Sequence, residues 1–409
     1  MGNIALSGYT EKANNTSGGL RSNMNPIAND LELHLEPTIA PWIAKKENIN
    51  LAIGIIQGEQ RWVKGWGSLQ SQRDETSESI EVDGKTIFEI GSVTKVFTTT
   101  LLSLLVECGK LELTTPINRL GKAYQSLPNA ITLESLATHT SGLPPLPSNL
   151  NKSMGQDEQN PYAAYTFEEL HDYLRTLPSR DMKNAGTISY SNLGVGLLGN
   201  ILAEQLNQSY EATIVGQICN PLGLLDTRIA LNDEQQTRFA AGYLEDGKPI
   251  KPWDLPTLAG AGALRSTADD LLAFVAANLQ PEKTAIATAI LNTHPLRHNT
   301  FAPTSGVIGL MEKAAQFVRR ARGNPLVRRE EVGVALGWFV EYLLGCDRYA
   351  YTHTGGTGGH RSFCGFIKET QTGVIILSNY GEVLSSLFGR YSIDRVGLKL
   401  LEIISDRAR

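Results

Sequence analysis

The stretch FEIGSVTKVFTTTLLSLL, which begins at Phe88, places Ser92 three residues before Lys95 at the start of an apolar run. On a helix, residues three apart share one face, so the two side chains can meet. A serine hydroxyl becomes a good nucleophile when a base takes its proton, and a lysine can be that base if burial or cationic neighbours lower its pKa. A helix start also directs backbone N–H groups at the reacting centre. The SxxK spacing alone is weak evidence for a nucleophile and its base, because chance matches are common in 409 residues.

The stretch ISYSNLG supplies three polar side chains in a row, Tyr190, Ser191 and Asn192. A tyrosine beside a cationic lysine can ionise in part and move protons, and an asparagine can hydrogen-bond both the lysine and a substrate carbonyl. The alternative is a loop before a helix, in which Tyr190 packs and Asn192 caps the helix. The motif by itself favours that structural alternative.

The stretch YTHTGGTGGH, which begins at Tyr351, has too many glycines to pack well as an ordinary strand. Such a strand allows close backbone access, either for a substrate paired along its edge or for an N–H group that stabilises an oxyanion. A bulge or tight turn is the structural alternative. No GK[ST] follows, so the stretch is not a phosphate-binding loop. His353 and His360 lack a third ligand at suitable spacing, and we expect no metal.

The composition is that of an ordinary globular enzyme, with 41% hydrophobic and 19% charged residues. A net charge of -5 gives no general attraction to nucleic acid, and no run is long and apolar enough for a transmembrane helix. The four cysteines form no CxxC, and no motif indicates a cofactor. The first residues lack the apolar core of a signal peptide, which predicts a cytoplasmic protein, or a periplasmic one if a signal was removed.

Apolar periodicity and turn residues predict the order of elements. Residues 1 to 28 are rich in Asn, Ser, Gly and Thr and predict a flexible tail, followed by a helix capped by Asn29 or Asp30. A hairpin around Gly58, a helix over 96 to 107 and a long helical stretch follow, then strands after about residue 332 and a closing amphipathic helix. This order predicts an α/β (α+β) sandwich, residues 29–120 and 290–409, interrupted by a helical domain, residues 121–289.

The three motifs SVTK, YSN and HTG in this order resemble those of the serine β-lactamase and penicillin-binding-protein superfamily. The resemblance is closest to the branch of class C β-lactamases, DD-carboxypeptidases and family VIII esterases, and it spans about residues 35 to 405. Further matching stretches are LATHTSGLP at Leu136, NPLGLLDT at Asn220, GAGALRSTADDL at Gly260, LGW at Leu336 and GGTGGHRSFCGF at Gly355. The resemblance implies a β-lactamase/transpeptidase-like fold, an antiparallel sheet flanked by helices plus a helical domain, with the site in the cleft between them.

The resemblance also implies a role for each motif residue. Ser92 would be the acylated nucleophile, Lys95 its proton acceptor, and Tyr190 a general base or acid with Lys95. Asn192, with the strand residues His353, Thr354, Gly355 and Gly356, would bind substrate, and the backbone N–H groups of Ser92 and Gly356 would form the oxyanion hole. No acidic deacylation base of the class A kind can be assigned by motif, so water activation would fall to Tyr190.

His353 departs from the lysine that class C β-lactamases generally carry at this position. An unperturbed imidazole has a pKa of about 6.5 and is mostly neutral at neutral pH, so a carboxylate anchor would be weakened. If His353 binds a substrate carboxylate, KM for an acidic substrate should rise as the pH passes about 6 to 7. The alternative is a structural hydrogen-bond donor that holds the strand.

These observations predict a serine hydrolase that forms an acyl-enzyme through Ser92. Its substrate would be a small molecule or peptide with an amide or ester bond, such as a D-residue peptide, an ester or a β-lactam. An acyltransferase or peptide cyclase could use the same acyl-enzyme, with an amine or hydroxyl in place of water. A catalytically silent penicillin-binding-like sensor is the third possibility, and intact Ser92, Lys95 and Tyr190 argue against it.

Overall fold

The computed structural model describes residues 26–44, 46–69, 79–150, 157–177, 182–299, 327–381 and 392–406 of the 409-residue chain. The predicted tail therefore lies outside the described residues up to position 25. The first helix, α1 (Pro26–Ile43), begins before Asn29 and Asp30, so the prediction that one of them caps it is wrong. Among the described helices, none is long and apolar enough to cross a membrane.

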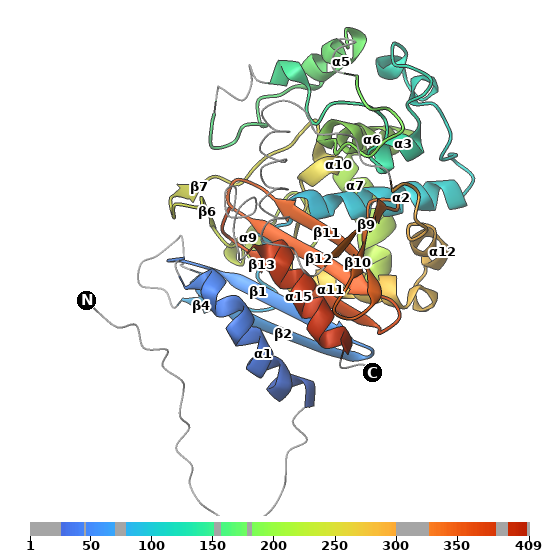
Figure 1. Ribbon diagram of the computed structural model, residues 1–409. Helices are drawn as coiled ribbons and strands as arrows, with labels where there is room; N and C mark the ends of the chain where they lie inside the picture. Colours follow the sequence, from blue (N-terminus) through green and yellow to red (C-terminus); the bar gives the residue numbers. More distant parts are fainter. Residues whose placement is uncertain are drawn as a thin grey trace, which may run out of the picture.

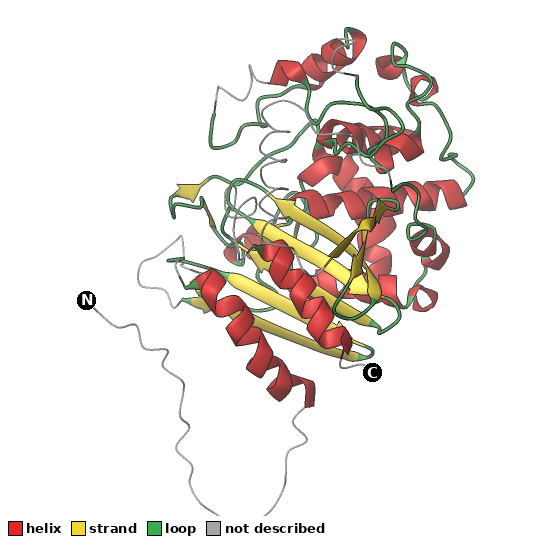
Figure 2. Cartoon of the chain, in the orientation of Figure 1, coloured by secondary structure: helices red, strands yellow, loops and turns green. Residues whose placement is uncertain are grey.

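A seven-stranded antiparallel sheet lies at the centre of the α/β part (Figure 2), in the order β2-β1-β13-β12-β11-β10-β9. The first hairpin pairs with the last strand, and Leu51 lies opposite Ser378. Segments from both ends of the chain therefore build one sheet. The strands are β1 (Leu51–Gln57), β2 (Gln60–Trp66), β9 (Val327–Val334), β10 (Phe339–Leu343), β11 (Arg348–Gly356), β12 (Arg361–Ile367) and β13 (Thr372–Ser378).

Helices cover both faces of this sheet. Helices α1 and α15 (Ile393–Asp406) lie side by side on one face, and α11 (Ala268–Leu279) packs on the other (Figure 1). Alternate residues of β1 serve the two layers, because side chains along a strand point to opposite faces. Ile53 lies in the apolar layer under α1 and α15, whereas Ala52 belongs to the larger core on the other side.

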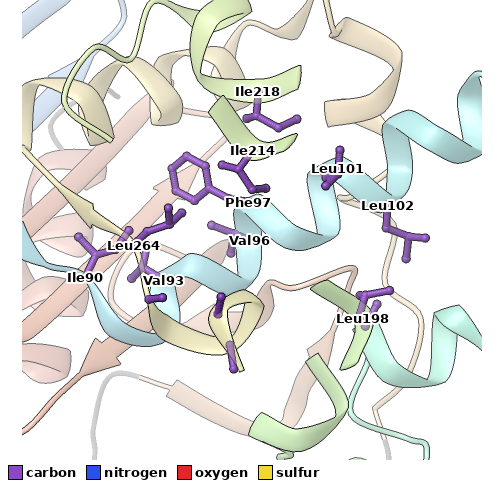
Figure 3. Close-up of a cluster of buried hydrophobic side chains, with 14 of the residues drawn as sticks. Ile90, Val93, Val96, Phe97, Leu101, Leu102, Leu198, Ile214, Ile218 and Leu264 are labelled. Atoms are coloured by element: carbon purple, nitrogen blue, oxygen red, sulfur yellow. The ribbon is translucent and has the colours of Figure 1, made fainter. Parts of the chain in front are cut away.

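Helix α2 (Thr94–Glu107), which follows the SVTK serine, runs through the middle of the larger core. Apolar side chains surround it (Figure 3): Val96, Phe97 and Leu101 lie among Leu198, Ile214, Ile218 and Leu264. The Phe97 ring stacks on Phe274 of α11 with ring centroids 4.2 Å apart. The first three turns of α2 are buried, and its threonine and serine hydroxyls there are hydrogen-bonded inside the protein. This burial determines the surroundings of Lys95.

The remaining described helices are α3 (Leu133–Ala137), α5 (Phe167–Arg175), α6 (Asn192–Gln205), α7 (Tyr210–Ile214), α8 (Asn220–Leu222), α9 (Asp233–Thr237), α10 (Ala259–Gly262) and α12 (Ala287–Leu291). Of these, α3, α5, α6 and α10 lie at the top of Figure 1, whereas α9 and α12 lie lower, at the level of the sheet. Short strands pair as β3 (Ser68–Leu69) with β4 (Ile80–Glu81), β5 (Phe88–Glu89) with β8 (Arg265–Ser266), and β6 (Gly242–Tyr243) with β7 (Pro249–Ile250).

Several local predictions are confirmed. The hairpin turns at Gly58 with φ +59°, α2 contains the predicted helix with Gly109 in the left-handed region just after it, and α15 closes the chain. Thr267 caps α11, as its side chain accepts from Asp270 N–H. The stretch VALGWFVEYL is not one strand, because it contains the end of β9, a turn at Gly337 with φ +79°, and β10.

The division into domains stays a prediction. Helix α11 lies inside residues 121–289, the range predicted to be helical insertion, yet it packs against β1, β12 and β13. The α/β layer therefore includes at least this helix from the middle of the chain.

Candidate active site

Ser92 lies in the 3₁₀ turn Gly91–Val93 that leads into α2, and Lys95 lies in the first turn of α2. The Lys95 side chain is fully buried. Its Nζ atom is 2.9 Å from Ser92 Oγ, 2.7 Å from Asn192 Oδ1 and 2.7 Å from the carbonyl oxygen of Ala261. The structure thus brings together the SVTK lysine and the YSN asparagine, as expected from their motifs.

The partners of Lys95 determine where a proton can move. The Asn192 and Ala261 oxygens can only accept hydrogen bonds, whereas the Ser92 hydroxyl can donate as well. Burial holds the pKa of Lys95 well below its usual range, which favours the neutral amine. A neutral amine donates two hydrogen bonds to the two fixed acceptors and turns its lone pair to the remaining neighbour, Ser92. Lys95 is therefore placed to receive the Ser92 proton.

Tyr190 lies beside both Ser92 and Lys95. Its phenol hydrogen-bonds the Ser92 hydroxyl, and Lys95 Nζ is 4.8 Å from the centre of its ring. The residue is 36% exposed. Burial raises the pKa of Tyr190 above its usual value, more than the hydrogen bond with Ser92 lowers it. The predicted role of Tyr190 in proton transfer stays a prediction.

His139 is a site residue that the motif analysis did not single out. It is buried, with φ +59°, and its ring lies 4.5 Å from the Tyr190 ring, centre to centre. Its carbonyl oxygen accepts from Ser189 N–H at 2.8 Å, and its Nδ1 accepts from Ser191 N–H at 3.2 Å. Burial holds the pKa of His139 well below its usual range, so Nδ1 keeps its lone pair. His139 thus holds the backbone on both sides of Tyr190.

His353 lies on β11 and is 2% exposed. Its Nδ1 lies 2.7 Å from the Thr354 carbonyl oxygen, and its Nε2 has no hydrogen-bond partner among the described residues. Burial lowers the pKa of His353 to about 3. The expectation that His353 changes charge between pH 6 and 7 is therefore wrong, since its surroundings disfavour the cation. Its role in substrate binding stays a prediction.

The glycines after His353 are required by the approach of two backbones. A Cβ atom on Gly355 would lie 2.0 Å from the Ile90 carbonyl oxygen, and one on Gly91, where φ is +47°, would lie 2.5 Å from Gly356 N. The end of β11 therefore lies directly against the turn that carries Ser92. The first N–H group that donates within that turn is Val93 N–H, which binds the Ile90 carbonyl oxygen. Ser92 N–H comes one residue earlier, so it has no carbonyl partner inside the turn.

A cavity of about 350 Å³, which includes space open to solvent, lies over the nucleophile. Of the predicted site residues, Ser92, Asn192 and Gly356 line it, whereas Lys95, Tyr190, His353, Thr354 and Gly355 lie outside its lining. The sequence analysis did not anticipate the rest of the wall, which consists of Leu146, Tyr162, Trp253, Leu255, Leu258, Ala261, Gly262 and Thr357. These residues lie in loops and short elements whose pairing is not evident from the sequence.

A buried carboxylate fixes one side of this cavity. Glu89, three residues before Ser92, accepts from Trp253 N–H at 2.7 Å and from the Thr357 hydroxyl at 2.6 Å, and its Oε2 is 3.1 Å from His360 Nδ1. Although burial alone would raise the pKa of Glu89, the hydrogen bonds and charge of His360, with Thr357 and Arg265, hold it below its usual value.

His360 completes this network with its second nitrogen, which lies 3.0 Å from the Ala240 carbonyl oxygen. Both of its partners are acceptors, so the ring satisfies both when it carries two protons. No group of three or more histidine, cysteine, aspartate or glutamate side chains within the described residues could hold a metal ion.

Comparisons with known proteins agree with this geometry. The sequence matches the β-lactamase family over residues 37–388. A β-lactamase from Providencia stuartii is 27% identical over 84% of this chain and 86% of its own, and one from Pseudomonas fluorescens is 25% identical over 86% and 94%. An unguisins hydrolase from Aspergillus violaceofuscus is 24% identical over 87% of this chain and 61% of its own. The structure of a class C β-lactamase superposes with a TM-score of 0.70, at 21% identity over 93% of this chain and 97% of that one.

The antiparallel sheet with its helical layers is thus the fold of the class C β-lactamases, and with this family match the protein is a serine hydrolase. The chain belongs to the β-lactamase family.

Proposed function

We propose that the protein hydrolyses an amide or ester bond through an acyl-enzyme on Ser92. The observation that carries this proposal is the set of contacts of Lys95, a buried amine with two fixed acceptors and one hydroxyl, that of Ser92, within 2.9 Å. Of these three neighbours only the Ser92 hydroxyl can give up a proton, so Lys95 can act as a base toward Ser92 alone. Lys95 takes the Ser92 proton while Oγ bonds to the substrate carbonyl carbon, and the new ammonium then donates to all its neighbours.

The remaining residues complete the two half-reactions. The N–H groups of Ser92 and Gly356 receive the charge that develops on the carbonyl oxygen. Tyr190 gives its phenol proton to the leaving group and is reprotonated from Lys95. Water then takes the place of the leaving group, loses a proton to the Tyr190–Lys95 pair and attacks the ester, and Ser92 regains its proton. No step requires a cofactor.

The substrate is an amide or ester whose scissile carbonyl reaches Ser92 from the cavity, such as a small ester, a peptide with D-residues or a β-lactam ring. The names of the relatives support hydrolysis, of a β-lactam in particular, because they include β-lactamases and an unguisins hydrolase.

A fluorophosphonate label followed by intact mass measurement tests the proposal. The wild type should gain one label, Ser92→Ala should gain none, and the control Ser68→Ala, at an exposed serine, should react like the wild type. A label of this type avoids the exposed thiol of Cys108. Undiminished labelling of a folded Ser92→Ala protein would show that another group is the nucleophile.

A further inference from the structure

We propose that Thr98 and Tyr210 are positioning residues for the base, because their hydroxyl groups hold helix α10 in place. This helix presents the Ala261 carbonyl oxygen to Lys95 Nζ at 2.7 Å. Neither Thr98 nor Tyr210 lines the cavity over Ser92, so both act through Lys95 and not on the substrate. Their role rests on the acyl-enzyme function proposed above, in which Lys95 takes the Ser92 proton.

Thr98 connects α2 to α10. It is fully buried and lies three residues after Lys95, so the two side chains share one face of α2. The Thr98 hydroxyl is 2.7 Å from the Gly260 carbonyl oxygen, and Lys95 Nζ is at the same distance from the carbonyl oxygen of Ala261. Two neighbouring carbonyl groups of α10 therefore face α2, one bound by the candidate base and the other by the threonine.

Tyr210 completes a chain of hydrogen bonds that ends on α10. Its phenol oxygen is 2.6 Å from Thr98 Oγ1, and both side chains are buried. The carbonyl oxygens within reach of Thr98, those of Gly260 at 2.7 Å and Thr94 at 3.3 Å, can only accept, and the shorter distance favours Gly260. The single threonine proton is then in use, so Tyr210 donates to Thr98. Each donor in such a chain polarises the next, which strengthens the bond to Gly260.

Glycines bring the neighbouring helices close to these hydroxyl groups. A Cβ atom on Gly260 would lie 2.8 Å from Gly199 Cα, and one on Gly199 would lie 3.1 Å from the Tyr210 ring. Helix α6, which contains Gly199, begins at Asn192, the other fixed acceptor of Lys95. Tyr210 thus lies where α2, α6 and α10 meet, and these three helices carry Lys95 and its two acceptors.

Loss of the Thr98 hydroxyl would act on Lys95 through α10. The Gly260 carbonyl group would lose this donor, and α10 would no longer be held to α2 at that point. The Ala261 carbonyl oxygen moves with the helix, so Lys95 loses part of an acceptor that stabilises its ammonium form. The pKa of Lys95 then falls further, and its lone pair is directed less well at Ser92.

The rate at which a fluorophosphonate labels Ser92, followed by intact mass as a function of pH, tests this role. In this reaction Ser92 Oγ bonds to phosphorus, fluoride leaves, and the serine proton goes to Lys95. Fluoride leaves without a proton, so the rate reports the serine–lysine step. The other titratable groups beside Lys95 stay neutral where the amine titrates, because burial lowers the pKa of His139 and His353 and raises that of Tyr190.

Thr98→Val keeps the shape of the side chain and removes its hydroxyl. We expect the plateau of the labelling rate to fall by about tenfold and its midpoint to move about one pH unit lower, because a hydrogen bond that stabilises the ammonium is weakened. Thr98→Ser should keep the wild-type profile. The matched control is Thr100→Val, which removes a similarly buried hydroxyl that bonds the Val96 carbonyl oxygen of its own helix and should leave the midpoint unchanged.

Tyr210→Phe gives a second test that retains both the ring and Thr98. It should move the midpoint in the same direction as Thr98→Val but by less, because Thr98 loses its donor and keeps its bond to Gly260.

A midpoint in folded Thr98→Val equal to that of Thr100→Val would overturn the inference, while labelling of wild-type Ser92 upheld the proposed function. A midpoint in Thr98→Ser as low as in Thr98→Val would also contradict the role of the hydroxyl. If Thr98→Val does not fold, an unchanged midpoint in Tyr210→Phe decides against the inference. Absence of label on Ser92 in the wild type would overturn the acyl-enzyme function as well.

Discussion

Replacing Glu89 with glutamine tests whether one buried carboxylate holds the candidate site together. Glu89 is 4% exposed and lies on β5, directly before the turn of Ser92. It receives hydrogen bonds from Trp253 N–H and the Thr357 hydroxyl, and it pairs with His360. Thr357 and Trp253 both line the cavity wall, so the carboxylate connects the nucleophile segment to both.

The size of the effect follows from these contacts. Hydrogen bonds to a charged group contribute roughly 1.5–3 kcal/mol each, and Glu89 receives two of them, from Trp253 N–H and the Thr357 hydroxyl. Glutamine keeps one acceptor oxygen but turns an NH₂ group toward the other donor. We therefore expect Glu89→Gln to lower the free energy of unfolding by about 3 kcal/mol.

Urea denaturation of the wild type, Glu89→Gln and a matched control measures this change. The control is Glu59→Gln, which removes the exposed pair with Lys283, at 2.6 Å, and should leave the midpoint nearly unchanged. Because the pKa of Glu89 is lowered on folding, its stabilisation exists above the unfolded pKa and is lost as the pH falls through the folded value. That acid-side loss should be smaller in the variant. Equal urea midpoints for Glu89→Gln and wild type would refute the reasoning.

Two further substitutions test the proton path and its support. Lys95→Met should lower the acylation rate by about 10²-fold or more, because the neutral amine is the base. In the wild type this rate should rise with pH and level off well below pH 10, because burial lowers the pKa of Lys95. A rate in Lys95→Met equal to that of wild type would place the base elsewhere. His139→Phe keeps a ring against Tyr190 but removes the acceptor of Ser191 N–H, so it should lower kcat more than it raises KM. His139→Asn should retain more activity, because asparagine tolerates the positive φ of this position. Loss of stability with unchanged kcat would show that His139 supports the fold alone.

The sequence predicted the parts of the fold that depend on local pattern. Alternating apolar residues around Gly58 predicted the first hairpin, and the apolar run after Lys95 predicted α2. The order of the three motifs predicted the family, which the match over residues 37–388 confirms. Asn192 was expected to contact Lys95, and it does so at 2.7 Å. These features could be inferred because each is encoded by spacing within a short stretch.

The features that sequence reasoning missed depend on contacts between distant segments. Nothing near His139 in the sequence shows that its ring will hold Ser191, 52 residues later, or that Glu89 will meet Thr357 from the far end of the chain. The charge of His353 was misjudged for the same reason. An isolated imidazole titrates near pH 6.5, whereas this one is surrounded by protein, and its burial opposes protonation.

Ser92 and Lys95 lie at the start of α2, so the burial of this helix determines their chemistry. The apolar residues that follow Lys95 require the helix to be buried on all sides, and that burial takes the Lys95 amine out of water. A lysine at the same spacing on an exposed helix would remain an ammonium and could not accept a proton from serine. The apolar residues after the motif therefore help to make Lys95 a base, because their burial lowers the pKa of Lys95. The SxxK spacing alone would leave this pKa unchanged.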